Sequence, residues 1–298
     1  MLAVAILLLL SYAADSGRAG ADALLQAGRY QESALAYIAL LRNAPDDPDL
    51  LEGAGRSLIG LAAPERAIPF FEREIALRPL SHDGSRWLSE AFIAAGKFEA
   101  ARQLLARMVV ADPADGGTWS QLGLVSYRTG YYPAALNAFD HALTAGKGLE
   151  TASTRNRVEV LRAISLVETG ATADAASVVP GLLARPENSA NLDLLLIYVR
   201  LLYETGSHAE ALRQSDRALA VAPGNAAVHF WRARLFQEND EIARAVSEAE
   251  RSRDLAPSSP APRSLLVRLY RKSGRDEDAG REAGWLREHE SADGRAQP

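Results

Sequence analysis

A period of 34 residues runs through this chain of 298 residues and restricts it to a repeated fold. Glycines mark the period first: Gly28 and Gly96 are two steps of 34 apart, and Gly96 and Gly130 are one step apart. Gly206 and Gly274 are again two steps apart, and only the middle of the chain departs from the period, with steps of 40 and 36. A fixed spacing of roughly 20–50 residues is typical of chains that stack similar supersecondary units.

Prolines and small side chains keep the same spacing. The prolines are Pro45, Pro79, Pro113, Pro223 and Pro257. A small residue follows five places after each turn site, at Ser33, Ala67, Ala101, Ala135, Ala175, Ala211, Ala245 and Ala279; Ala62 and Asp240 stand at the two turn sites without glycine. Glycine ends a helix, a small residue lets two helices approach, and proline cannot continue a helix. Each period is therefore predicted to be a helix, a turn and a second helix.

The clearest single period contains Trp119-Ser-Gln-Leu122-Gly123, followed by Gly130, Tyr132, Ala135, Phe139 and Ala142. This pattern resembles the tetratricopeptide-repeat family, whose unit is a helix–turn–helix of 34 residues. The resemblance implies an all-α, right-handed superhelical solenoid and covers nearly the whole chain. Eight repeats are predicted, starting near Ala14, Pro48, His82, Gly116, Asn156, Leu192, Ala226 and Pro260.

The repeats depart from the family pattern at a few positions. Ser126 stands where an aromatic residue is usual, and Glu74 and Ser252 stand where alanine is usual. Pro180 falls inside the second helix of the fifth repeat. That helix is predicted to be kinked or short, because proline removes a backbone donor from the helix interior.

The middle irregularity divides the predicted repeats into two groups. Residues 14–147 are assigned to repeats 1–4 and residues 156–290 to repeats 5–8, with an insertion at 148–155. The insertion is either a longer loop within one continuous superhelix or a hinge between two halves. Residues 291–298 are polar and are predicted to be a disordered tail.

Residues 1–13 differ from the rest of the chain. Leu2 to Leu10 is an unbroken apolar run, and Ser11-Tyr12-Ala13 then offers small residues. This order resembles a secretory signal peptide, although no basic residue precedes the run. As a helix, Leu2 to Ala14 would span roughly 20 Å, short of the roughly 30 Å hydrocarbon core. The alternatives are a cleaved signal, an uncleaved membrane anchor and an ordinary cytosolic helix. An exported or membrane-anchored location is favoured over the cytoplasm.

Charge and composition restrict the partners. The chain has 33 basic and 38 acidic residues, a net charge of −5, and no polybasic segment. Nucleic-acid binding is therefore not predicted, because it depends on basic side chains that neutralise phosphates. The absence of cysteine excludes disulfides, thiolate zinc sites, a cysteine nucleophile and a lipid-bearing cysteine.

No pattern in the sequence indicates an active site. The histidines His82, His141, His208, His229 and His289 lack the spacing of metal ligands on a helix. Gly146-Lys147-Gly148 lacks the glycine spacing and the hydroxyl residue of a phosphate-binding loop. Hence no catalytic, cofactor-binding or metal-binding residue is predicted, and the chain is expected not to be an enzyme.

In the family that the chain resembles, the first helix of each repeat lines a concave surface that receives a peptide or a partner's helix. Arg200, Arg234 and Arg268 take the same place in three successive repeats. Neighbouring helices lie roughly 8–10 Å apart and an extended chain rises about 3.3 Å per residue. The three arginines could then meet every third residue of an acidic ligand. Alternatively, Arg200 pairs with Glu204 and Arg234 with Glu238 on an exposed helix face.

Aromatic residues form a second set of groove candidates. They are Trp87, Tyr127, Tyr203, Phe230 and Trp231. Interface anchors are enriched in Trp, Tyr and Arg, but a register shift of one residue would bury some of them. Arg18 and Asp22 stand where the family members that grip a carboxyl-terminal peptide have a lysine–asparagine pair, so the chain is not expected to belong to that subset.

The sequence therefore predicts a non-enzymatic scaffold or adaptor that binds other proteins. Its expected setting is an envelope or secretion complex, reached by export or by a membrane tether. A cytosolic adaptor or regulator and an accessory subunit of an enzyme complex are the alternatives. An intact N-terminus on a soluble protein would favour the cytosolic adaptor. A bound metal or cofactor in the purified protein would favour the accessory subunit.

Overall fold

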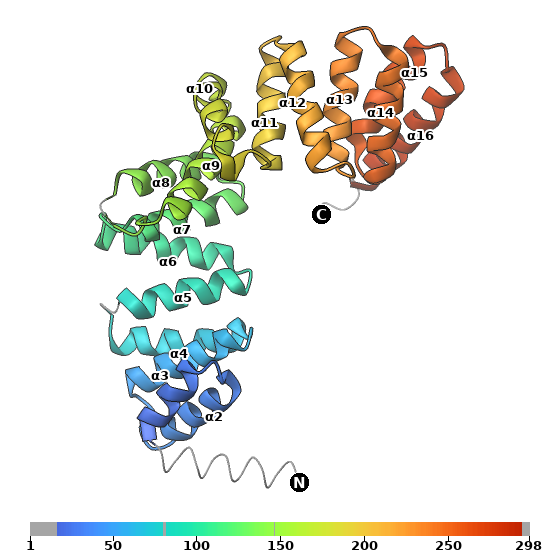
Figure 1. Ribbon diagram of the computed structural model, residues 1–298. Coiled ribbons are helices and arrows are strands. Elements are labelled where there is room, and N and C mark those ends of the chain that lie inside the picture. Colours follow the sequence, from blue (N-terminus) through green and yellow to red (C-terminus); the bar gives the residue numbers. More distant parts are fainter. Residues whose placement is uncertain (1–16, 80–81, 146, 294–298) are drawn as a thin grey trace. The chain divides into compact units, whose positions relative to one another are not determined.

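The computed structural model describes residues 17–79, 82–145 and 147–293 (Figure 1). The predicted signal or anchor at 1–13 lies outside the described residues. Of the predicted tail, residues 291–293 end the last helix, and residues 294–298 are not described. No helix in the described ranges is both long enough and apolar enough to cross a membrane.

The described residues fold into helices. Residues 17–26 are helical and are followed by α2 (Tyr30–Leu41), α3 (Pro48–Gly60), α4 (Pro64–Leu77), α5 (His82–Ala94), α6 (Phe98–Ala111), α7 (Gly116–Arg128), α8 (Tyr132–Thr144), α9 (Ala152–Glu168), α10 (Thr172–Leu183), a short 3₁₀ turn (Pro186–Asn188), α11 (Leu192–Glu204), α12 (His208–Val221), α13 (Ala226–Glu238), α14 (Ile242–Leu255), α15 (Pro260–Lys272) and α16 (Asp276–Asp293). The only strand-like pairing among these residues is an isolated bridge between Asp115 and Lys147. The all-α prediction is confirmed.

Most first helices begin at the predicted repeat starts, at Pro48, His82, Gly116, Leu192, Ala226 and Pro260. The fifth repeat differs, because α9 begins at Ala152 instead of Asn156. The Thr151 hydroxyl oxygen accepts a hydrogen bond from the Thr154 amide at 3.0 Å and so caps the earlier start. Half of the segment predicted as an insertion, 148–155, is therefore helical.

The turn between the two helices of each repeat depends on a left-handed residue. The six glycines predicted to end the first helices have φ between 71° and 78°, at Gly28, Gly96, Gly130, Gly170, Gly206 and Gly274. The two turn sites without glycine adopt the same conformation, with φ of 53° at Ala62 and 59° at Asp240. The turn geometry is thus common to all eight sites, and glycine meets it without the steric cost of a Cβ atom.

Close approach of the two helices explains a second set of glycines. A Cβ atom added to Gly123 would lie 2.5 Å from the ring of Phe139, and one added to Gly55 would lie 2.6 Å from Phe71. Both phenylalanines are fully buried. The ring of the second helix therefore occupies the space that a side chain on the first helix would need.

The fifth repeat has a shortened second helix. Pro180 lies inside α10, which has 12 residues, whereas α12 and α14 have 14. The 3₁₀ turn Pro186–Asn188 follows it. The prediction of a short helix agrees with this geometry, because the proline ring lacks the amide that would continue the helix ladder.

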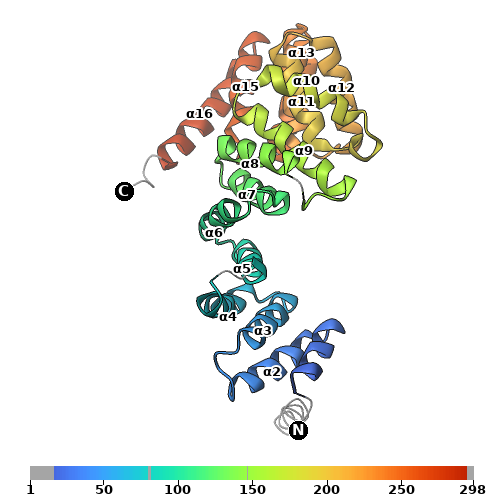
Figure 2. The same cartoon turned by 90° about the vertical axis from the view of Figure 1, so that its left-hand side faces the viewer.

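The chain forms two compact units, residues 1–162 and 163–298, and their boundary falls inside α9. In the first unit, α2 to α8 stack in chain order, each against the next (Figures 1 and 2). In the second, α11 to α16 do the same. Each unit has its own buried apolar clusters, for example around Phe71 and Leu105 in the first and around Phe236 and Leu265 in the second.

Candidate protein-binding surfaces

An arginine held among aromatic rings is the main feature of the first-helix face in residues 163–298. The Arg234 guanidinium lies 4.2 Å from the ring centre of Tyr203, 4.9 Å from that of Trp231 and 5.9 Å from that of Phe230. Tyr203 comes from α11 and the other three residues from α13. Four of the eight predicted groove residues are thus brought together, and Arg234 is half-buried. We call these four residues the Arg234 cluster.

The phenol of Tyr203 connects this cluster to an acidic side chain. Its hydroxyl donates to Glu238 Oε1 at 2.8 Å. Burial raises the pKa of Tyr203, the bond to Glu238 raises it further, and Arg234 opposes both. The alternative pairing of Arg234 with Glu238 is not formed, because Glu238 binds the phenol and the guanidinium stacks on the rings.

The other two members of the predicted arginine ladder lie in different surroundings. Arg200 makes ion pairs with Glu204 at 2.9 Å and with Glu168 at 3.5 Å. At this residue the helix pair with Glu204 is formed. Arg268 is exposed and makes no ion pair with any residue that the structure describes. The three arginines therefore take the same place in their repeats but have different contacts.

Trp87 and Tyr127 belong to the first unit, and the structure does not bring them together. The Trp87 ring is half-buried beneath the guanidinium of Arg56 at 5.0 Å. Tyr127 is half-buried and meets Tyr132 edge-on at 5.8 Å between ring centres. Both rings pack against core clusters, as do Tyr203, Phe230 and Trp231, and all five are half-buried.

The first helices of the second to fifth repeats share a groove of about 430 Å³ that sequence reasoning missed. Its apolar lining comes from Ile59, Ile93, Leu124 and Leu161, and Glu90 and Arg157 are its charged residues. The sequence carries a weak signal for it, because Ile59 and Ile93 are 34 residues apart, as are Glu90 and Leu124. Spacing alone does not show that these side chains leave a hollow.

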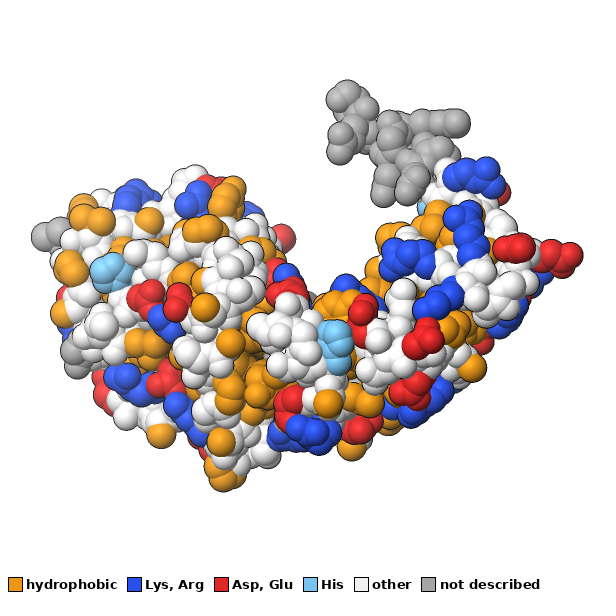
Figure 3. Space-filling view, turned by 90° about the horizontal axis from the view of Figure 1, so that it is seen from above, with side chains coloured by type: hydrophobic (Ala, Val, Ile, Leu, Met, Phe, Trp, Pro, Cys, Tyr) orange, Lys and Arg blue, Asp and Glu red, His pale blue; other side chains and the backbone are white. Residues whose placement is uncertain are grey.

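On the face that Figure 3 draws, basic and acidic side chains are interspersed. Many are paired locally, for example Arg73 with Asp46 at 2.6 Å and Lys272 with Asp240 at 2.6 Å. In the described ranges, no group of three or more histidine or acidic side chains could hold a metal ion.

Comparison with protein families decides which family these repeats represent. The family described as tetratricopeptide repeat matches residues 18–82, 53–116, 88–150 and 198–260, which together are more than half of the chain. The chain belongs to the tetratricopeptide-repeat family. Members of this family generally serve as non-catalytic scaffolds that bind other proteins, which supports the predicted protein-binding role in general terms. No curated protein matches the sequence.

Solved structures of tetratricopeptide-repeat proteins have the same fold. A tetratricopeptide repeat protein from Parabacteroides merdae is 15% identical, with a TM-score of 0.54 over 88% of this chain and 98% of that one. The C-terminal part of a repeat protein from Cytophaga hutchinsonii is 15% identical, with a TM-score of 0.60 over 83% and 98%. A chain of the APC/C hetero-tetramer Cut9–Hcn1 is 13% identical, with a TM-score of 0.57 over 88% of this chain and 50% of that one. At these identities the likeness concerns the fold alone.

Proposed function

We propose that this tetratricopeptide-repeat protein is a non-enzymatic adaptor that binds an acidic, partly apolar segment of another protein through the Arg234 cluster. The observation that carries the proposal is a half-buried guanidinium held among aromatic rings, without an ion pair to any described residue. Arg268, one repeat further on, supplies a second unpaired cation.

The chemistry of arginine supports this choice of ligand. A guanidinium stacked on rings keeps its edge donors, which match both oxygens of a carboxylate. Because the rings restrict its motion, less conformational entropy is lost when a ligand binds. Tyr203, Phe230 and Trp231 provide apolar surface beside it, and Trp, Tyr and Arg dominate measured binding energies at interfaces.

Substitution of the arginines tests the proposal. We expect Arg234→Ala to abolish capture of the partner in a crosslinked pull-down from native cells, and Arg268→Ala to weaken it. The matched control is Arg213→Ala on α12, because Arg213 is exposed and paired with Glu210. Capture should also weaken with added salt, since exposed charges are screened. Recovery of the same partners from wild type and Arg234→Ala would contradict the proposal. Helical content should be the same in all three variants.

We further propose that the adaptor acts in an envelope or secretion complex, as an exported or membrane-tethered protein. The apolar run from Leu2 to Leu10 supports this proposal. The intact mass of the protein from fractionated cells tests it. A mass reduced by the N-terminal segment indicates a cleaved signal, and full-length protein in the membrane fraction indicates a tether. Full-length protein in the cytosolic fraction would favour the cytosolic adaptor instead.

A further inference from the structure

In several repeats the fourth residue, counted from the start of the first helix, fills a slot beside the second helix. In the fourth repeat this residue is Trp119, whose ring stacks on His141 with 4.4 Å between ring centres. Its indole N–H donates to the carbonyl oxygen of Pro113 at 3.0 Å. The slot is thus bounded by a carbonyl six residues before the fourth position and a side chain 22 residues after it.

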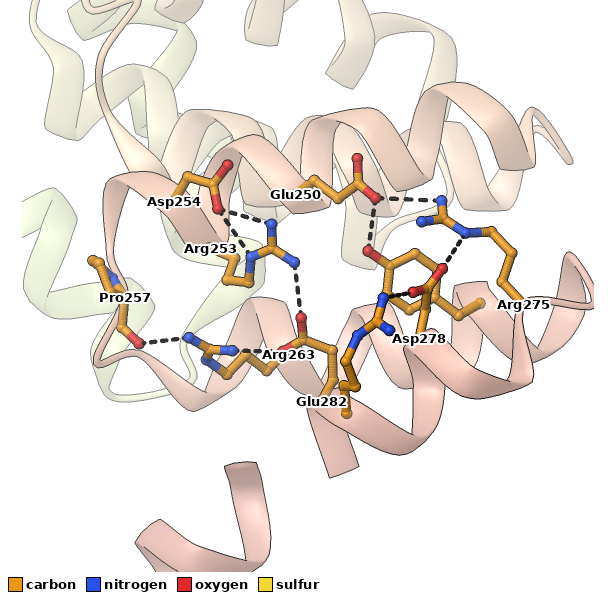
Figure 4. A network of polar contacts seen from close by, with 10 residues as sticks. Glu250, Arg253, Asp254, Pro257, Arg263, Arg275, Asp278 and Glu282 are labelled. Atoms are coloured by element: carbon orange, nitrogen blue, oxygen red, sulfur yellow. Dashed lines mark hydrogen bonds and ion pairs between the residues drawn. The ribbon is translucent and has the colours of Figure 1, made fainter. Parts of the chain in front are cut away.

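Two other repeats fill the same slot with different chemistry. In the seventh repeat, His229 Nε2 lies 2.9 Å from the carbonyl oxygen of Pro223. In the eighth, Arg263 donates to the Pro257 carbonyl at 3.1 Å and lies 4.1 Å from the ring centre of Trp285 (Figure 4 shows the Arg263–Pro257 contact). Each of these three side chains therefore meets the carbonyl six residues earlier.

The slot of the third repeat is open. Its fourth residue is Ser85, and a cavity of about 460 Å³ lies between α4, α5 and α6. The cavity is lined by Ile75, Leu88, Phe92, Leu104 and Met108. This cavity is separate from the groove at Ile59 and Ile93. Leu88 and Phe92 of α5 line the cavity, whereas Glu90 and Ile93 of the same helix line the groove.

The polar groups of the slot are in place in the third repeat, although no indole fills it. The Pro79 carbonyl, which corresponds to that of Pro113, receives no side-chain donor from the described residues. Arg107 takes the place of His141, is exposed, and has no ion pair in the described part of the chain. In the second repeat the hollow is smaller, about 220 Å³, and its arginine, Arg73, is bound to Asp46.

We infer that the open slot of the third repeat receives a tryptophan side chain from a partner polypeptide. The inserted ring stacks on Arg107, whose positive charge complements the negative face of an indole. The indole N–H donates to the Pro79 carbonyl, as Trp119 donates to Pro113 in the next repeat. A volume of 460 Å³ lies within the usual range of roughly 300–1,000 Å³ for ligand sites. The slot is separate from the Arg234 cluster, so this inference does not depend on the proposed function.

A small fluorinated peptide provides the test. The probe is acetyl-Gly-Trp-Gly-amide carrying 5-fluorotryptophan, titrated with the full chain and followed by ¹⁹F NMR. We expect saturable binding that unlabelled acetyl-Gly-Trp-Gly-amide displaces and acetyl-Gly-Leu-Gly-amide does not. The analogue with a methylated indole nitrogen should compete about threefold less well or worse, because it cannot donate to the carbonyl.

Two variants close the slot from opposite sides. Ser85→Trp supplies the ring from within the chain, as Trp119 does, and should lower the affinity for the probe by about tenfold or more. Ala111→Trp narrows the rim from an exposed position on α6 and should have the same effect if Ser85→Trp fails to fold. Arg107→Ala should weaken binding several-fold. Ala220→Trp is the matched control, because Ala220 is exposed on α12 and lines no described hollow.

The outcomes separate clearly. Loss of probe binding in Ser85→Trp or Ala111→Trp, with binding retained in Ala220→Trp, supports the inference. Absence of saturable binding to the wild-type chain would overturn it. Equal binding to wild type and to a folded slot variant would also overturn it, because the probe would then bind elsewhere.

Discussion

Ala62 and Asp240 carry a Cβ atom in a backbone conformation that favours glycine. Both occupy the left-handed turn that glycine provides in the other six repeats, with φ of 53° and 59°. For residues with a Cβ atom this conformation costs about 1–2 kcal/mol. Asp240 has a partial compensation in its ion pair with Lys272, whereas Ala62 has none of this kind.

We therefore expect Ala62→Gly to raise the free energy of unfolding by about 0.5–1 kcal/mol, since relief of strain exceeds the extra flexibility of glycine in the unfolded chain. Urea denaturation measures the change. The reciprocal control is Gly130→Ala, which should lower the same quantity by about 1 kcal/mol or more. Equal stability of Ala62→Gly and wild type would show that the turn at Ala62 is unstrained.

Tyr270 gives residues 163–298 a dependence on alkaline pH. Burial raises the pKa of its phenol to about 12, and the hydrogen bond to Glu250 at 2.7 Å contributes to the rise. Because the folded pKa lies above the ordinary value of 10.0, the stabilisation is fully present below pH 10 and is lost as the pH rises toward 12.

The variant Tyr270→Phe tests this dependence. Wild type should be more stable than Tyr270→Phe by about 1 kcal/mol at pH 8, because the variant lacks the bond to Glu250. The difference should shrink as the pH rises from 10 to 12. Urea denaturation at several pH values measures it, and a difference that stays constant would contradict the assignment.

Residue-level chemistry was only partly predictable from the sequence. The pair of Arg200 with Glu204 follows from helix spacing, because residues four apart face each other. The surroundings of Arg234 do not follow, because Tyr203 reaches it from the neighbouring repeat. Side chains on one helix can be placed by spacing, whereas contacts between repeats depend on packing in three dimensions.

At the level of helices, the two helices of a repeat pack together through side chains of complementary size. Gly123 faces Phe139 in the fourth repeat, and the same places in the third repeat hold Ser89 and Leu105, all buried. A larger residue on the first helix thus goes with a smaller one on the second. The two repeats are alternative solutions to one packing problem.

This relation predicts a compensated double variant. Gly123→Ser should lower the free energy of unfolding by about 1–3 kcal/mol, because the added atoms overlap the Phe139 ring. Addition of Phe139→Leu should restore part of that loss by reproducing the pair of the third repeat. A double-mutant cycle by denaturant unfolding measures the coupling. Additive effects would indicate that the two helices separate instead of repacking.

Helix positions were predicted well where the period is regular and less well where it breaks. Of the six first helices that begin as predicted, five start three residues after a proline of the period, and α11 starts after the 3₁₀ turn. The start of α9 was placed four residues too late, because the cap at Thr151 is a local signal that the period does not contain. The open slot and the groove at Ile59 were also missed, since a hollow depends on the combined sizes of several side chains.

In the whole molecule, contacts run mainly between successive helices, as expected for a repeat protein. Stability is then a sum of repeat terms and nearest-neighbour terms. We expect Gly123→Ser to raise amide hydrogen exchange most in α7 and α8, less in α6, and not in α15 and α16. Mass spectrometry of exchanged peptides measures this profile. A uniform rise over the chain would show that the repeats unfold together instead.

The loops at Pro45, Pro79 and Pro113 are 34 residues apart, so a gene of this kind can lose one whole repeat at a time. Recombination between equivalent sites removes 34 residues, so loss of residues 82–115 leaves the second repeat joined directly to the fourth. Trp119 would then follow Pro79 at the spacing it now has from Pro113. A single crossover would thereby supply the missing ring from within and fill the open slot, in a chain that is shorter by one repeat.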